Sequence, residues 1–261
     1  MSLIGTVDSV WRYPVKSMRG EELDEIFVGY PGVYGDRLFA FTSSNAPKGF
    51  PYFTGREQRQ MILYRARFRQ PDKAARPLNL AEAESNGAAP LSATPEELAI
   101  EVEAPDGSLF AIDDPALAEK LRAGLEVKHE LTLLRSDRAL TDCGPLSLFS
   151  VQTVSKLEEE TGCAVDKRNF RANVYLDLPS SGPFAEDNFV GRNLRLGSKA
   201  VVTIVKRDGR CMMITLDPET AEKTPAILKT VAQAHDGKAG VYAAVLAEGM
   251  VRKGDPVELL D

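Results

Sequence analysis

The chain has 261 residues, of which 43% are hydrophobic and 27% charged, and its net charge is −6. This balance is typical of a globular protein with a substantial core, and the acidic excess argues against nucleic acid as a partner. No apolar run approaches the roughly 20 residues that span a bilayer. The first residues also lack a secretory pattern, so we expect a cytoplasmic protein that does not enter a membrane.

The three cysteines, Cys143, Cys163 and Cys211, form no CxxC pair and suit a reducing compartment. The two histidines, His129 and His235, lie far apart and neither has a second histidine or a cysteine close by in sequence. Their spacing therefore argues against a disulfide framework and against a closed zinc site.

In the first half of the chain, short alternating segments separated by Gly, Pro and Asp predict strands at residues 4–13, 23–28, 37–42 and 61–68. Residues 71–95 are rich in Ala, Pro, Asn and Glu and predict a surface loop. A hairpin is expected around Asp106-Gly107, and a helix is expected to begin at Asp114-Pro115 and end at Gly124.

The second half returns to strands, predicted at residues 130–135, 173–178, 194–196, 200–206, 241–246 and 257–260. Helices are expected over 149–160, ending at Gly162, and over 225–234. The fold class is therefore mainly β with a few helices (α+β), typical of a β-barrel or sandwich. A break near 136–142 marks a possible boundary between two domains.

Cys211 follows Arg207-Asp208-Gly209, which predicts a turn after a strand. Arg207 and Arg210 are close in sequence, and cations lower the pKa of a thiol towards the thiolate that ligates soft metals or attacks electrophiles. On the local sequence alone a second interpretation is favoured, in which Cys211 is a small buried apolar residue.

Several other segments offer cations or hydroxyls to an anion. Asp166-Lys167-Arg168 precedes Arg171 and Asn173, where an anion cradle and a solvated turn are both consistent with the residues. Ser150 and Thr153 begin a helix, and there they bind an anion or cap the helix. Lys16 and Ser17 follow Pro14 without the spacing of a P-loop, and Gly35-Asp36-Arg37 predicts a tight turn.

Six segments, taken in order, resemble a known family over nearly the whole chain. They are VWRYPVKSMRGEEL, GDRLFAF, DKRNFRANVYLD, FAEDNFVGRNLRLG, RCMMITLDPETAE and EGMVRKGDPVEL. The family is the MOSC family, and the resemblance is greatest to its two-part members, among them the mitochondrial amidoxime-reducing component and its bacterial relatives. Residues 61–95 do not match.

This resemblance implies an N-terminal MOSC β-barrel-like domain over residues 1–115 and a MOSC-type β-barrel over 116–261. It implies a molybdenum–molybdopterin cofactor with Cys211 as the protein ligand to the metal. The residues that it assigns to the pterin and its phosphate are Lys16, Ser17, Arg37, Ser150, Thr153, Arg171, Asn173 and Arg210.

By the same resemblance, the expected activity is reduction of small N-hydroxylated compounds with electrons from a separate redox protein. Asp142 is a candidate proton source, although a loop residue that caps a turn explains it as well. Two alternatives stay open: a sulfur-transfer protein that carries a persulfide on Cys211, and a non-catalytic carrier of the cofactor.

Overall fold

A computed structural model describes residues 1–260 and divides the chain into two compact units. The first, here called the barrel unit, contains residues 1–12, 21–33 and the chain from 141 onward; the second unit contains residues 13–20 and 34–140. These units are discontinuous in sequence, so they do not coincide with the expected domains 1–115 and 116–261. The first strand pairs with strands near the end of the chain, so the N-terminus belongs to the C-terminal fold.

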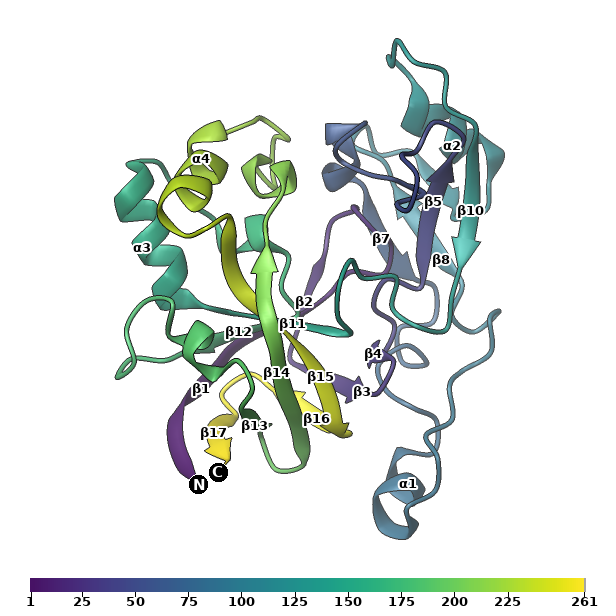
Figure 1. Ribbon diagram of the computed structural model, residues 1–261. Helices are drawn as coiled ribbons and strands as arrows, with labels where there is room; N and C mark the ends of the chain where they lie inside the picture. Colours follow the sequence, from purple (N-terminus) through teal and green to yellow (C-terminus); the bar gives the residue numbers. More distant parts are fainter. Residues whose placement is uncertain (261) are drawn as a thin grey trace. The chain divides into compact units, whose positions relative to one another are not determined.

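The barrel unit is built on one closed sheet (Figure 1). The strands follow one another in the order β12-β11-β15-β14-β13-β17-β1, and β1 pairs again with β12 to close the ring. Alternate side chains of these strands fill its interior, and most of them are fully buried. The strands are β1 (Ser2–Arg12), β11 (Leu146–Ser150), β12 (Val174–Asp177), β13 (Asn193–Leu196), β14 (Ala200–Gly209), β15 (Lys238–Ala247) and β17 (Pro256–Leu260).

The two chain ends lie side by side in this unit, because Ser2 pairs with Leu259 across β1 and β17 (Figure 1). A short strand, β2 (Glu21–Leu23), continues the sheet beyond β1. A separate three-stranded sheet has the order β16 (Gly249–Arg252), β3 (Glu25–Gly29) and β4 (Gly32–Val33). The prediction of a mainly β fold that contains a barrel is thus confirmed.

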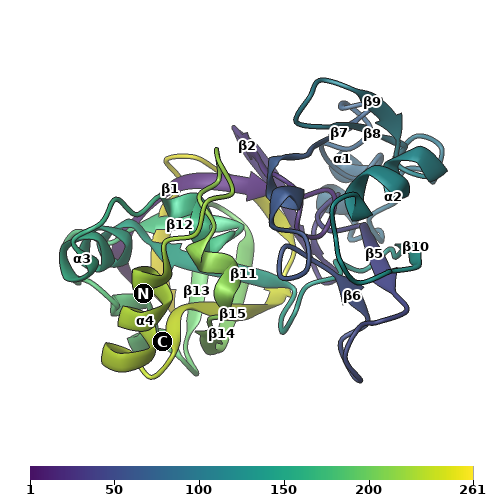
Figure 2. The ribbon, with the colours of Figure 1, turned by 90° about the horizontal axis from the view of Figure 1, so that it is seen from above.

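Two helices, α3 (Val151–Thr161) and α4 (Pro225–Ala234), pack against each other beside the barrel (Figures 1 and 2). The sequence predicted both. Ser150 caps the start of α3, and Gly162 ends it in the left-handed conformation. The unit also has three 3-10 helices, η2 (Lys167–Phe170), η3 (Ala185–Phe189) and η4 (Met212–Thr215).

The second unit contains two three-stranded antiparallel sheets around a core of its own. One has the order β10 (Leu131–Arg135), β5 (Phe39–Ser43), β6 (Tyr52–Phe53); the other has the order β7 (Arg65–Phe68), β8 (Ile100–Glu103), β9 (Leu109–Ala111). Helix α2 (Pro115–Arg122) begins at Asp114, which caps it, with proline in its first turn as predicted.

Three local predictions differ from the structure. Residues 61–68 begin as a 3-10 turn, η1 (Arg59–Leu63), before β7 starts. The expected loop 71–95 contains a helix, α1 (Leu80–Asn86), none of whose residues is buried. The predicted turn at 207–209 is strand, because β14 keeps pairing with β15 through Arg207 and Gly209. None of the helices in residues 1–260 meets the length and apolarity that a membrane crossing needs.

The closed sheet predicts a sharp difference between two leucines of the barrel. Leu194 in β13 is fully buried, whereas Leu246 in β15 is 49% exposed. We expect Leu194→Ala to lower the free energy of unfolding by about 2–5 kcal/mol, because it leaves a cavity in the core. The control, Leu246→Ala, changes it by about 0.5 kcal/mol or less. Denaturant unfolding of both variants measures the difference, and equal losses contradict the barrel interior described here.

Candidate cofactor site

Cys211 lies two residues beyond the end of β14 and directly before η4. Its side chain is half-buried, and its Sγ atom accepts and donates no hydrogen bond within residues 1–260. The backbone carbonyl of Cys211 accepts from the N–H of Ile214, which starts the 3-10 turn. The sulfur is thus held on a fixed backbone and is available as a ligand or nucleophile.

The neighbouring side chain, Arg210, points into the barrel unit and is committed to internal partners. Its Nε donates to the carbonyl of Ala239 at 2.7 Å and its Nη1 to the carbonyl of Phe170 at 3.0 Å. Nη1 also lies 2.8 Å from a carboxylate oxygen of Asp208, and both of these side chains are nearly inaccessible. Nη2 is buried and has no acceptor within the described residues.

Two aromatic rings flank the Arg210 guanidinium. The rings of Phe149 and Phe170 stack on each other with centroids 4.1 Å apart, and the guanidinium carbon lies 5.3 and 5.5 Å from their centroids. Such cation–π contacts stabilise a desolvated cation. Gly240 makes room for the group, because a Cβ there would lie 2.9 Å from Nη2 of Arg210 and 2.5 Å from the Phe149 ring.

The sequence places two cations near Cys211, and the structure gives each of them a carboxylate. Arg210 pairs with Asp208, and Arg207 lies 2.8 Å from Asp187. Burial raises the pKa of Asp187 above its ordinary value, although the charge of Arg207 opposes that rise. The positive charge predicted beside Cys211 is therefore largely balanced by nearby acids.

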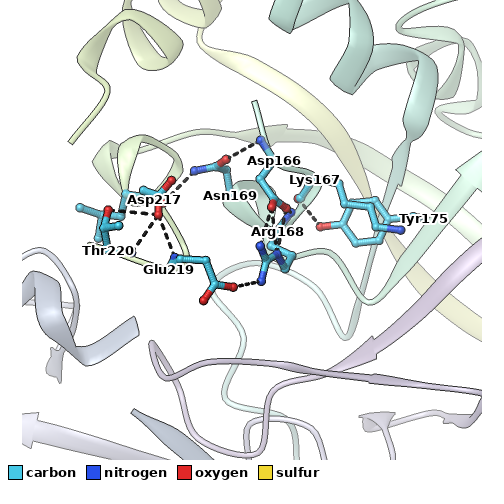
Figure 3. A network of polar contacts seen from close by, with 9 residues as sticks. Asp166, Lys167, Arg168, Asn169, Tyr175, Asp217, Glu219 and Thr220 are labelled. Carbon is cyan, nitrogen blue, oxygen red and sulfur yellow. Dashed lines mark hydrogen bonds and ion pairs between the residues drawn. The ribbon is translucent and has the colours of Figure 1, made fainter. Parts of the chain in front are cut away.

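A network of polar contacts joins η2 to the loop that follows Cys211 (Figure 3). Arg168 donates to Asp166 through Nε and Nη2, and its Nη1 donates to Glu219 at 2.5 Å. Asn169 donates from Nδ2 to the carbonyl of Leu216 at 2.7 Å. Together with the bond from Arg210 to Phe170, these contacts fix the cysteine loop against the segment that ends in Arg171.

The same network is anchored to the barrel strands at its other end. The Tyr175 hydroxyl in β12 donates to the carbonyl of Lys167 at 2.6 Å (Figure 3). The Lys167 ammonium donates to Asp8 at 2.7 Å and to Ser9 at 2.8 Å in β1. The charges of residues 166–168 are thus partly exposed and paired within the protein, which differs from a fully solvated turn.

Three predicted site residues adopt a backbone conformation that side chains seldom take. Ser17, Arg37 and Arg171 have φ angles of 66°, 46° and 53°, and the described chain has only three other non-glycine residues with positive φ. Non-glycine residues in this region store strain, and such residues cluster at functional sites. The coincidence supports these three positions independently of any family resemblance.

Three other predicted residues are committed to internal contacts. Ser150 and Thr153 are fully buried; Ser150 caps α3, and the Thr153 hydroxyl donates to the buried carboxylate of Glu186. Asn173 is also fully buried, where it accepts from Ser147 and donates to the carbonyl of Trp11. The capping alternative therefore describes Ser150, and all three side chains hold the barrel together.

Lys16, Ser17 and Arg37 lie in the second unit. The backbone N–H of Lys16 donates to Phe39, and its ammonium donates to the carbonyl of Leu140 at 2.7 Å. Arg37 lies 2.5 Å from the fully buried Asp36. The YPVKS and GDR segments thus form one hydrogen-bonded cluster within this unit.

Sequence reasoning missed Asp208, Phe149 and Phe170 as parts of the site. Asp208 is two residues from Arg210, which is the spacing of neighbours on one face of a strand, but Asp-Gly normally predicts a turn. No local pattern marks the two rings. Asp142, the candidate proton source, is exposed in the loop before β11.

Within the described chain, no three His, Cys, Asp or Glu side chains are arranged to hold a metal ion. A metal at Cys211 would therefore need most of its ligands from a bound group rather than from the protein. The unliganded sulfur, the unsatisfied Nη2 of Arg210 and the strained Arg171 fit an anionic group of that kind. Arg171 directly follows Phe170, whose carbonyl accepts a hydrogen bond from Arg210.

Comparison with known proteins adds two family matches. Residues 4–119 match the MOSC N-terminal beta barrel domain, and residues 135–258 match the MOSC domain. A 79-residue stretch is 37% identical to the molybdenum cofactor sulfurase of Danio rerio. That stretch is 30% of this chain but 9% of the relative, so the chain corresponds to a small part of it.

Two solved structures are similar to this chain. YuaD of Bacillus subtilis is 13% identical with a TM-score of 0.48, and the match covers 98% of this chain and 94% of that one. YiiM of Geobacillus stearothermophilus is 22% identical with a TM-score of 0.36, and the match covers 45% and 55%.

The contact between Gly240 and Arg210 leads to a prediction with a matched control. Gly240 and Gly237 both have left-handed backbones, but a Cβ at Gly237 would meet nothing within 4 Å. We expect Gly237→Ala to cost about 1 kcal/mol of unfolding free energy for backbone strain. Gly240→Ala should cost about 1–3 kcal/mol more, because it displaces Arg210 and Phe149. Thermal unfolding compares the two, and equal losses contradict the packing.

The network at η2 predicts a pH-dependent stability. Burial of Asp166 disfavours its charged form, but hydrogen bonds from the Arg168 side chain and backbone outweigh this and hold its pKa below the ordinary value. The folded protein thus binds this proton more weakly than the unfolded chain, whose Asp pKa is about 3.9. The carboxylate therefore stabilises the fold above that pH, and the contribution disappears as pH falls through the folded pKa.

Asp166→Asn keeps a capping residue and removes the charge. We expect it to lower the free energy of unfolding at pH 7, with a difference from wild type that shrinks below about pH 4. The control is Asp24→Asn, at an exposed carboxylate that forms no ion pair within residues 1–260. Denaturant unfolding across the pH range tests this, and a difference that grows towards low pH refutes it.

Proposed function

Because the chain belongs to the MOSC family and carries both its N-terminal beta barrel domain and its MOSC domain, we propose that it binds a molybdenum cofactor and reduces N-hydroxylated compounds. The observation that carries the proposal is Cys211. Its half-buried sulfur has no internal partner, and its backbone is fixed between β14 and η4.

In this proposal Cys211 is the single protein ligand to the metal. Thiolates are the side chains that soft metal centres prefer. When bound, the cofactor would supply a two-electron couple that accepts an oxygen atom. Asp208, Phe170 and the η2 network keep the Cys211 backbone in one position, so the sulfur is pre-organised for ligation.

The pterin phosphate would be held by cations and hydroxyls. In the barrel unit the candidates are Arg171 and the Nη2 donor of Arg210. Lys16, Ser17 and Arg37, which the family resemblance also assigns to the cofactor, lie in the second unit and form a cluster of their own there. Arginine forms paired hydrogen bonds to phosphate, and the left-handed backbones of Arg171, Ser17 and Arg37 are the kind of strain that ligand sites retain. We do not include Ser150, Thr153 and Asn173 among the phosphate ligands, because their side chains form hydrogen bonds inside the barrel unit.

The overall reaction consumes two electrons and two protons: the N–O bond breaks, one proton ends on the nitrogen, and the other joins the hydroxyl group, which leaves as water. An iron–sulfur cluster is usually held by four cysteine thiolates, and the three cysteines of this chain are scattered in sequence. We therefore propose that a separate redox protein delivers the electrons.

A second function is favoured by one observation. The 37% identical stretch belongs to a protein named molybdenum cofactor sulfurase, which makes sulfur transfer a reasonable alternative. Cys211 would then carry a persulfide and need no metal. A cofactor carrier is the third possibility, and it requires the anion site without turnover.

Metal analysis of protein produced in a host that makes the cofactor tests the proposal. We expect wild type to hold molybdenum and pterin, and Cys211→Ala to lose most of the metal. Cys163→Ala is the matched control, since Cys163 is also half-buried but lies at the end of α3. Its molybdenum content should stay at the wild-type level. Equal metal in the Cys211 and Cys163 variants refutes the proposed ligand.

Turnover separates the three functions. A metal-loaded reductase reduces an amidoxime with reduced viologen as electron donor, and Cys211→Ala abolishes that activity. Loaded protein without turnover indicates a carrier. Metal-free protein whose Cys211 gains a sulfur atom, detected by mass spectrometry, indicates sulfur transfer.

A further inference from the structure

Residues 56–76 of the second unit contain an unusual concentration of arginine. They include six arginines and one lysine against two acids, whereas the whole chain has a net charge of −6. All six arginines are exposed. This segment lies within the residues that match the MOSC N-terminal beta barrel domain, and none of its residues has a place in the proposed cofactor site.

The fold arranges three of these arginines in a row on β7. Arg65 and Arg67 are exposed, and the residues that alternate with them, Ala66 and Phe68, are buried. The backbone of Arg69 donates to Ala99 and so continues the ladder with β8, which keeps Arg69 on the exposed face. We call these three residues the arginine row; alternate residues of a strand are about 7 Å apart.

The acids beside the row leave most of its charge uncompensated. Glu101 and Glu103 of β8 lie opposite Arg67 and Arg65. Among these four side chains, the only ion pair formed within residues 1–260 joins Arg67 to Glu103 at 3.6 Å. The guanidinium groups of Arg65 and Arg69 form no ion pair in that part of the chain, and neither does Arg59 in η1.

The row is connected to the loop that carries two predicted cofactor residues. β7 lies at the edge of its sheet (Figure 2), and its free side forms a bridge between Arg65 and Arg19. The N–H of Arg19 donates to the carbonyl of Tyr64 at 2.9 Å. Arg19 follows Lys16 and Ser17 by three and two residues, so the row begins next to the cofactor loop within the same unit.

We propose that the arginine row is the docking surface for an acidic electron-carrier protein. The proposal rests on the proposed function, because a reductase whose electrons come from another protein needs a place for that protein to bind. Complexes between electron carriers and their partners have small interfaces and short lifetimes, and complementary charge speeds their formation. Two electrons reach the site for each N–O bond broken, so a one-electron carrier docks twice per turnover.

The composition of the row favours a protein over a polyanion. Arginine is enriched in protein interfaces and lysine is depleted, and the segment has six arginines to one lysine. Arginine pairs with surface carboxylates through two parallel hydrogen bonds. A simpler explanation is that charge on an edge strand prevents sheets from pairing. Glutamate at these positions serves that purpose equally well, so charge reversal separates the two explanations.

The test compares two double variants of the cofactor-loaded protein with the same change in net charge. Arg65→Glu/Arg69→Glu reverses the row. Lys48→Glu/Arg138→Glu is the control, at exposed cations of the same unit that form no ion pair within residues 1–260. Binding to a plant-type [2Fe–2S] ferredoxin and to a flavodoxin, both small acidic carriers, is measured by calorimetry at low and at high salt.

We expect wild type to bind one of these carriers, with an affinity that falls as salt rises. The row variant should bind on the order of tenfold more weakly than the control variant. Its KM for the carrier rises by a similar factor, while its activity with reduced viologen stays at the wild-type level. If the arginine row only stabilises the fold, its reversal should lower the activity with the carrier protein and the activity with reduced viologen to the same extent.

Three results overturn the docking proposal. In the first, wild type binds neither carrier; in the second, the two double variants bind a carrier equally well. In the third, the arginine row is needed for binding to anionic phospholipid vesicles or to an RNA oligonucleotide but not for binding to a carrier. Failure of the proposed function is recognised separately. If wild type binds a carrier through the arginine row but does not reduce the amidoxime with reduced viologen, the docking proposal stands and the proposed reaction is refuted.

Discussion

The ion pair between Asp208 and Arg210 fixes the geometry around Cys211. It lies in a nearly inaccessible place, where a lone charge is costly, so each partner requires the other. Through its other donors Arg210 holds the carbonyls of Phe170 and Ala239, which belong to the η2 segment and to β15. The residue before the cysteine thus joins three parts of the barrel unit. The η2 network holds the loop from its far side, so the sulfur has little freedom to move.

Local signals in the sequence predict helices α2, α3 and α4 but miss α1, and they predict the strand ends poorly. Asp114 and Pro115 mark the start of α2, and Gly162 marks the end of α3, because caps depend on residues close in sequence. The end of β14 depends on its partner strand, which lies some thirty residues farther along the chain. Arg207-Asp208-Gly209 therefore looks like a turn until β15 is seen to pair with it. For the same reason, the sequence alone does not show that β1 pairs with strands of the C-terminal half.

The candidate site shows where residue type is informative and where it is not. Cations and hydroxyls mark segments able to bind an anion, but they do not show which of them face inward. Asn173 and Thr153 have the same polar chemistry as Ser17, yet their partners are buried groups of other elements in the barrel unit. The left-handed backbone of Arg171 also has no signature in the sequence, because arginine has no preference for it. Contacts between residues far apart in the chain decide which polar side chains face inward and which residues take a left-handed backbone.

The pairing of the first strand has a consequence for synthesis on the ribosome. β1 completes its hydrogen bonds only with β12 and with β17, whose last residues lie at the end of the described chain. Until those residues emerge, β1 has only the three-residue strand β2 as a partner. The second unit is made entirely in between and contains its own core, so it is able to fold first. The nascent chain must therefore keep an edge of β1 open until β17 has emerged, and the barrel closes only after the second unit has been made.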